Sequence, residues 1–175
     1  QKVLSNGIRL YLMEDSELPL VKITLLVKAG QADDPPGKEG LAELTGKVML
    51  TGGARGLTGA QVDEELALMA ADVGCSANLE YSLCTLSVLK KDLARALDIF
   101  SRILQEPAFE EGKLQLSRSL KREELRRIAD NPDELAFRQY RRLLYRGDPR
   151  GRLTTLASLD RIERQDISAF HRRFF

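Results

Sequence analysis

Strand-type and helix-type hydrophobic patterns occur in separate pairs along this chain, and their order constrains the fold more than any other feature. Two strand patterns come first (residues 8–13 and 21–27), then two helical patterns (41–49 and 62–70), two more strand patterns (75–79 and 82–89), and helical patterns to the end. A doubly wound parallel sheet would need strict alternation of strands and helices. The order therefore predicts an α+β fold, a mainly antiparallel or mixed sheet with helices packed on it.

The first two strand patterns are expected to form an antiparallel pair. Ile8, Leu10 and Leu12 alternate with other residues, and a turn-like segment at 14–19 separates them from the alternating residues 21–27. Consecutive strands joined by a short turn favour antiparallel pairing. We therefore expect the apolar side chains of residues 8–13 to lie on the buried face of the sheet.

The two cysteines of the chain fall in the second predicted hairpin. A turn centred on residues 79–80 places Cys75 opposite Cys84 on one apolar face. They would form a cross-strand disulfide in an exported protein, or a pair of small core residues in a cytosolic one. We favour the reduced pair. A reactive thiol is the least favoured alternative, because Glu80 is the only charged residue near them in the local sequence.

Length and charge indicate one ordinary globular domain. The chain has 175 residues, enough for a single core, and its 27 basic and 26 acidic residues leave a net charge of +1. There is no global field to recruit nucleic acid or an acidic membrane. No apolar run approaches the length of a membrane span. Because the chain starts at Gln1 and ends on Phe174 and Phe175, we expect a single domain over 1–175 that is a fragment of a longer protein.

Basic residues concentrate in two stretches, 118–127 and 138–152. Acidic residues are interleaved in the first stretch, and no aromatic stacking platform accompanies it. A solvated helical face is therefore a better interpretation than a nucleic-acid surface.

A series of short motifs runs along the whole chain. They are Leu4-Ser5-Asn6-Gly7, Gly40-Leu41-Ala42, Thr51-Gly52-Gly53, Glu106-Pro107-Ala108-Phe109, Asp130-Asn131-Pro132-Asp133, Gly151-Arg152 and Phe170-His171. No single motif is specific, but their order and spacing together resemble the first domain of an insulinase/pitrilysin-family half. That family includes mitochondrial processing peptidase and bacterial zinc peptidases.

The resemblance also implies where a zinc site would stand. In active members, the helix after the Gly-X-Ala step carries His-X-X-Glu-His, in which two histidines share a helix face and the glutamate activates a metal-bound water. At these positions this chain has Glu43, Gly46 and Lys47. Glu124 matches the distant third ligand of the family. The resemblance therefore implies a degenerate zinc motif that keeps one carboxylate.

We predict no metal and no catalytic residue in this chain. Zinc sites need three or four well-placed donors, whereas Lys47 puts a positive charge close to where the cation would lie. Lys47 is expected to pair with Glu43 at i,i+4 or with Glu124; the plain alternative is an exposed helix with an ordinary ion pair. The only histidine, His171, belongs to the last helical pattern, so any site built on histidine would have to use it.

A peptide-binding edge strand is also implied by the resemblance. In catalytic relatives the corresponding strand lies at a sheet edge and takes substrate by strand addition. An edge strand offers unpaired backbone groups, so this mode needs no special side chains. The candidate residues are Cys75, Ser76, Ala77 and Asn78. A plain core hairpin is the alternative, and the sequence does not separate the two.

The resemblance, together with the missing zinc-motif groups, implies a catalytically inactive domain that serves as the non-catalytic partner half of a zinc metallopeptidase and helps to enclose or bind peptide. Zinc is expected only in the catalytic partner. The expected partners are a catalytic insulinase/pitrilysin-like subunit or domain, or a second copy of this chain, together with a peptide substrate; nucleic acid and a membrane span are not expected. Two alternatives stay open. One is an active metal-dependent endopeptidase that uses Glu43, Glu123 and Glu124 with residues outside this chain, and the other is a purely structural subunit of a larger complex.

Overall fold

The computed structural model describes residues 1–15 and 17–175. The strands are β1 (Lys2–Val3), β2 (Arg9–Leu10), β3 (Leu20–Val27), β4 (Asp72–Ala77) and β5 (Ser82–Leu89). The helices are α1 (Leu41–Thr51), α2 (Gly59–Leu68), α3 (Leu93–Gln105), α4 (Glu111–Ala129), α5 (Pro132–Leu144), α6 (Leu156–Asp160) and α7 (Arg164–Phe174), with 3-10 turns at Gln31–Asp33, Lys90–Asp92 and Pro149–Gly151. The fold is α+β, as the order of the sequence patterns predicts.

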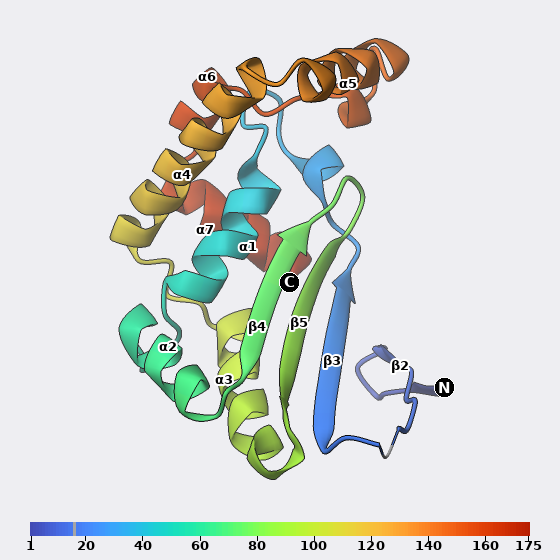
Figure 1. Ribbon diagram of the computed structural model, residues 1–175, viewed down its shortest axis with the longest axis vertical. Helices are drawn as coiled ribbons and strands as arrows, with labels where there is room; N and C mark the ends of the chain where they lie inside the picture. The colour runs from blue at the N-terminus through green and yellow to red at the C-terminus, as the bar shows by residue number, and fades with distance from the viewer. Residues whose placement is uncertain (16) are drawn as a thin grey trace.

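The main sheet is antiparallel, with the strand order β3-β5-β4. Figure 1 shows α1 and α7 beside this sheet and α5 at the far end of the molecule. Along the central strand β5, the residues that face the helices are buried and alternate with half-buried ones. This alternation is typical of a strand with one face on the core. Within the described part of the chain, no helix is long and apolar enough to cross a membrane.

The predicted register of the second hairpin is confirmed. Cys75 lies opposite Cys84, and the Asn78 N–H donates to the carbonyl of Tyr81 at 2.8 Å, which closes a turn on residues 79–80. The strand β4 begins at Asp72, earlier than the sequence pattern indicates. The two cysteine sulfur atoms are bonded, so the preference for a reduced pair is wrong for this structure. The two Cα atoms are 4.1 Å apart, because directly opposed residues of a narrow antiparallel pair bring their side chains together.

The predicted pairing of residues 8–13 with 21–27 is wrong. β2 pairs with β1, and β3 instead pairs with β5 over its full length. A local turn decides this, since Leu4 and Gly7 close a short hairpin in which Gly7 adopts a φ of +86°. The apolar side chains of residues 8–13 are consequently exposed, with Leu12 at 75%.

The core lies between the main sheet and the helices. The apolar stripe of α1, Leu41, Leu44, Val48 and Met49, is fully buried, and α1 packs against β4, α4 and α7. Its burial is what fixes the helix in the molecule, because helical stability in proteins comes mainly from packing an apolar face. The predicted zinc-motif positions Glu43, Gly46 and Lys47 therefore lie on a helix that is fixed by its packing.

Candidate functional site: a polar cluster between two helices

The predicted positions of the degenerate motif come together in the structure. Glu43, Gly46 and Lys47 lie on α1, and Glu124 lies on α4, which packs against α1. Residues three and four apart share one face of a helix. A sequence separation of about eighty residues is thereby reduced to a few ångströms between side chains.

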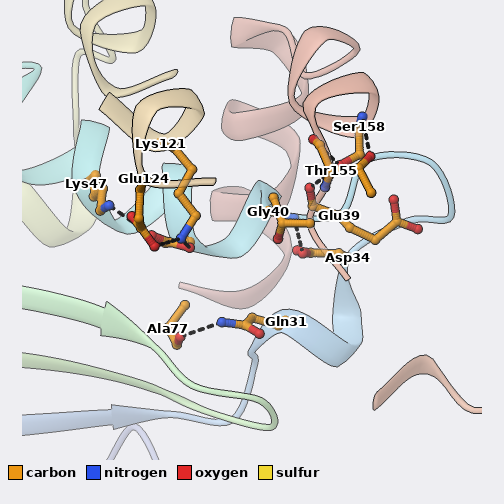
Figure 2. A network of polar contacts seen from close by, with 12 residues as sticks. Gln31, Asp34, Glu39, Gly40, Lys47, Ala77, Lys121, Glu124, Thr155 and Ser158 are labelled. Atoms are coloured by element: carbon orange, nitrogen blue, oxygen red, sulfur yellow. Dashed lines mark hydrogen bonds and ion pairs between the residues drawn. The ribbon is translucent and has the colours of Figure 1, made fainter. Parts of the chain in front are cut away.

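Four charged side chains form one continuous chain of ion pairs, which we call the polar cluster: Lys47, Glu43, Lys121 and Glu124. The Nζ atom of Lys47 lies 2.8 Å from Oε1 of Glu43, and Nζ of Lys121 lies 2.8 Å from the other oxygen, Oε2. Lys121 is also 2.6 Å from Oε1 of Glu124. Figure 2 shows the two lysines reaching the carboxylate oxygens from α1 and α4.

Lys121 is the residue that the sequence reasoning missed. The predicted ion pair between Lys47 and Glu43 is present. Glu124, the alternative partner predicted for Lys47, is bound by Lys121 instead. A lysine three residues before Glu124 on the same helix face was the available signal. Lys121 is only 8% exposed, so the ammonium group is enclosed between the two carboxylates.

The electrostatics of the cluster favour the charged forms. Burial alone would raise the pKa of Glu43, but hydrogen bonds and charge from Lys121 and Lys47 outweigh it and hold this pKa below its ordinary value. Burial would likewise lower the pKa of Lys121, yet Glu124 and Glu43 outweigh it and raise this pKa. The ion pairs thus offset the cost of removing the charged groups of Glu43 and Lys121 from water.

The donor set of the polar cluster does not fit a zinc ion. Lysine in its charged form has no lone pair to offer, and Gly46 has no side chain. The two remaining carboxylates, Glu43 and Glu124, are already bridged by Lys121. Among the residues that the structure describes, no group of three histidine, cysteine, aspartate or glutamate side chains could hold a metal.

The predicted edge strand lies next to the polar cluster. A Cβ atom placed on Gly46 would meet the carbonyl oxygen and the Sγ of Cys75 at 3.5 Å each, so α1 runs close to β4. β4 is an outer strand of the described sheet. Because Cys75 belongs to a narrow pair, its N–H and C=O point away from β5 toward the outer edge.

Not all of the predicted edge residues are available to a peptide. Cys75, Ser76 and Ala77 lie in β4, whereas Asn78 belongs to the turn. The carbonyl of Asn78 accepts from the N–H of Gln31 at 2.9 Å, and the side chain of Gln31 donates to the carbonyl of Ala77 at 3.2 Å (Figure 2). Among the described residues, the part of the edge without such contacts is therefore 72–75.

A buried carboxylate fixes the start of α1 beside the cluster. The two oxygens of Asp34 accept hydrogen bonds from the N–H groups of Gly40 and Ala42, both at 2.7 Å (Figure 2). Gly40 has a φ of +104°, which glycine adopts without strain. Burial raises the pKa of Asp34 to about 7, although both backbone hydrogen bonds act in the opposite direction. This contact holds α1 in register with the loop before it.

Comparison with known proteins identifies the family. The family model described as Insulinase (Peptidase family M16) matches residues 10–157. The chain belongs to the insulinase family. Two similar curated proteins are an uncharacterized zinc protease from Rickettsia bellii, 25% identical, and the mitochondrial-processing peptidase subunit beta from Dictyostelium discoideum, 27% identical. Each match covers 95% of this chain, but only 41% and 36% of the relatives, respectively.

Solved structures agree with this assignment at the level of the fold. A peptidase M16 inactive domain from Pseudomonas fluorescens has a TM-score of 0.83 and 24% identity, with 91% of this chain and 39% of that chain covered. Pitrilysin gives a TM-score of 0.77 and 20% identity, with 91% and 18% covered. The insulinase-family domain thus corresponds to a part of these longer chains.

Proposed function

We propose that this domain is the non-catalytic half of a two-part zinc peptidase of the insulinase family, and that it helps to enclose and bind the peptide. Zinc then belongs to the catalytic partner only. The observation that carries the proposal is Lys121, whose ammonium group bridges Glu43 and Glu124 where the family arrangement would need metal donors. Hydrolysis by a metal-bound water has no base here, because the corresponding position is Gly46.

The names of the similar proteins support a partner role. One similar structure is an inactive domain, and one relative is a subunit of a mitochondrial-processing peptidase. The relatives are more than twice as long as the matched region. The catalytic partner is thus either a separate chain or another domain of the same protein.

The peptide-binding part of the proposal rests on the outer edge of β4. Backbone groups of Cys75 that β5 does not use are directed to this edge, next to α1. An extended peptide can add to such an edge through main-chain hydrogen bonds alone. Loss of the catalytic groups therefore leaves peptide binding intact.

Reconstitution with a catalytic partner tests the proposal. The full chain is co-purified with an insulinase-family chain that carries an intact His-X-X-Glu-His motif, and zinc content and peptidase activity are measured for each chain and for the complex. We expect zinc and activity to follow the partner, and activity to rise when this chain is added. Stoichiometric zinc in this chain alone, with chelator-sensitive peptidase activity, would instead support the active-enzyme alternative.

A substitution at the edge strand separates peptide binding from a purely structural role. The backbone N–H and C=O of Val73 point to the outer edge of the sheet, as those of Cys75 do, because Val73 lies two residues earlier in β4. Val73→Pro removes an outward N–H that the sheet does not use, and Val73→Thr is the control that keeps it. We expect the proline variant to retain the partner and bind peptide more weakly. Equal peptide binding by both variants would favour the structural subunit.

A further inference from the structure

An open cavity lies beneath α5, outside the polar cluster. Its volume is about 920 Å³, and it is bounded by α5, the end of α4 and the segment 145–156. Four arginines line it: Arg138, Arg142, Arg146 and Arg152. Glu39 is the only carboxylate among the lining residues, and its Oε1 already accepts from the N–H of Gly37 at 2.9 Å.

The positive charge of this arginine cavity is compensated only in part by the described part of the chain, where the charges of Asp34 and Asp148 interact with Arg152. No carboxylate in residues 1–15 or 17–175 forms an ion pair with any of the four arginines. Arg138 and Arg152 donate instead to backbone carbonyls, those of Thr154 and of residues 32 and 34. Arg142 and Arg146 are exposed, so two guanidinium groups are available to a ligand.

A neighbouring side chain shows the same excess of charge. The Nε atom of Arg141 is buried and has no hydrogen-bond partner among the described residues, as is also the case for Arg118 and Arg122. Burial and the nearby charge of Arg138 both lower the pKa of Arg141. A second polar cavity, around Arg118 and Arg164, differs because its lining includes three carboxylates. The two cavities thus differ in the number of carboxylates in their linings, one against three.

Six leucine and isoleucine side chains form the apolar part of the lining. They include Leu135 and Leu143 of α5, Leu125 of α4, and Leu153. Among its described side chains, α5 has no buried residue, although its sequence is amphipathic. A helix with an apolar face normally buries that face against another element. The cavity therefore combines unpaired guanidinium groups with an uncovered aliphatic surface.

We propose that the arginine cavity binds an acidic, aliphatic segment of the peptide substrate. Carboxylates of the peptide pair with Arg142 and Arg146, and leucine-type side chains contact the aliphatic lining. Guanidinium groups bind carboxylates in planar, bidentate geometry, and the charge match selects against basic segments. The proposal deepens the proposed function and rests on it for the statement that the ligand is a substrate.

The position of the cavity supports a substrate more than an unrelated ligand. Its lining residue Leu125 directly follows Glu124 in α4, and Glu39 lies four residues before Glu43. One edge of the cavity is therefore adjacent to the polar cluster along α4. The lining has six leucine or isoleucine side chains and one aromatic side chain, that of Tyr145, whereas single-stranded nucleic acids are bound on platforms of several aromatic side chains.

Direct binding to short labelled peptides tests the proposal, by fluorescence anisotropy with the full chain. The probes are a peptide of alternating glutamate and leucine, its lysine-leucine analogue, its glutamate-serine analogue, and a single-stranded DNA oligonucleotide. We expect the glutamate-leucine peptide to bind most tightly, and its binding to weaken with salt. Arg142→Glu with Arg146→Glu should weaken it about tenfold or more, because two attractive contacts become repulsive.

The control variant carries the same change of charge elsewhere. Arg126→Glu with Arg172→Glu alters two exposed arginines outside the cavity and should bind the acidic peptide as the unmodified chain does. The neutral variant Arg142→Gln with Arg146→Gln should lose affinity to an intermediate extent. Equal losses in the control, equal binding of the lysine-leucine peptide, or tighter binding of the oligonucleotide would each overturn the proposal. These measurements need no catalytic partner, so their failure is distinct from failure of the proposed function.

Discussion

Removing the buried ammonium group of the polar cluster should destabilise the domain. Lys121→Met keeps most of the side-chain volume but leaves Glu43 with one cationic partner and Glu124 with none. Breaking a buried ion pair on one side costs about 3–5 kcal/mol. The Glu43 side chain is 18% exposed, and that of Glu124 is 49% exposed, so water and Lys47 recover part of this. We expect a loss of about 2 kcal/mol in the free energy of unfolding.

Chemical and thermal unfolding at neutral pH measure this loss. For a domain of this size a loss of about 2 kcal/mol lowers Tm by about 4–8 °C. Lys47→Met is the matched control, because it removes a more exposed ammonium from the same carboxylate, and it should cost well under 1 kcal/mol. Replacing Lys121 and Glu43 together by Met and Leu should recover most of the stability, since no unpaired charge then stays buried.

The pH dependence gives an independent check of the same reasoning. The pKa of Glu43 lies below its ordinary value of 4.5 in the folded chain. Its contribution to stability is therefore present above that value and is lost as the pH falls through the folded-state pKa. The difference between the unmodified chain and Lys121→Met should shrink in this acid range. A Lys121→Met variant as stable as Lys47→Met at neutral pH would refute the reasoning.

Two further predictions concern the same region. The first is a variant that rebuilds the family motif with Glu43→His, Gly46→Glu and Lys47→His. It should bind stoichiometric zinc, measured by elemental analysis, only when Lys121→Leu is added, because that change frees Glu124 as the third ligand. Zinc binding without that fourth change would contradict the assignment of Lys121. Asp34 has a pKa raised to about 7 from 3.8, so its contribution to stability is complete below the lower value and declines as the pH rises through the upper one. Relative to Asp34→Asn, the unmodified chain should lose at most about 4 kcal/mol of unfolding free energy over this range, and a flat or rising difference in chemical denaturation would contradict it.

Local features of this fold could be predicted because their signals lie within a few residues. The capping box of Thr58 and Gln61 starts α2, and Asn131 with Pro132 starts α5, as these residue types indicate. The turn at residues 79–80 fixes the hairpin register through adjacent hydrogen bonds. Each of these features depends only on contacts between residues that are near one another in the sequence.

The candidate site was predictable only in part. The i,i+4 spacing on one helix gives the pair of Glu43 and Lys47. The bridge from α1 to α4 depends instead on how two helices pack, and this brings Lys121 into contact with residues far away in the sequence. The side-chain pattern of one helix does not encode which residue of another helix will face it.

By itself, the sequence determined the order of elements, their local starts and turns, and the absence of histidines at the positions where the family motif has them. Only the tertiary structure decided that β3 pairs with β5 and not with residues 8–13 and that the cysteines are joined. It also decided that Lys121 closes the polar cluster and that four arginines line one cavity under α5. The physical reason is the range of the interactions. Periodicity, capping and turns act between near neighbours, whereas strand choice, ion-pair partners and cavities depend on packing between distant segments.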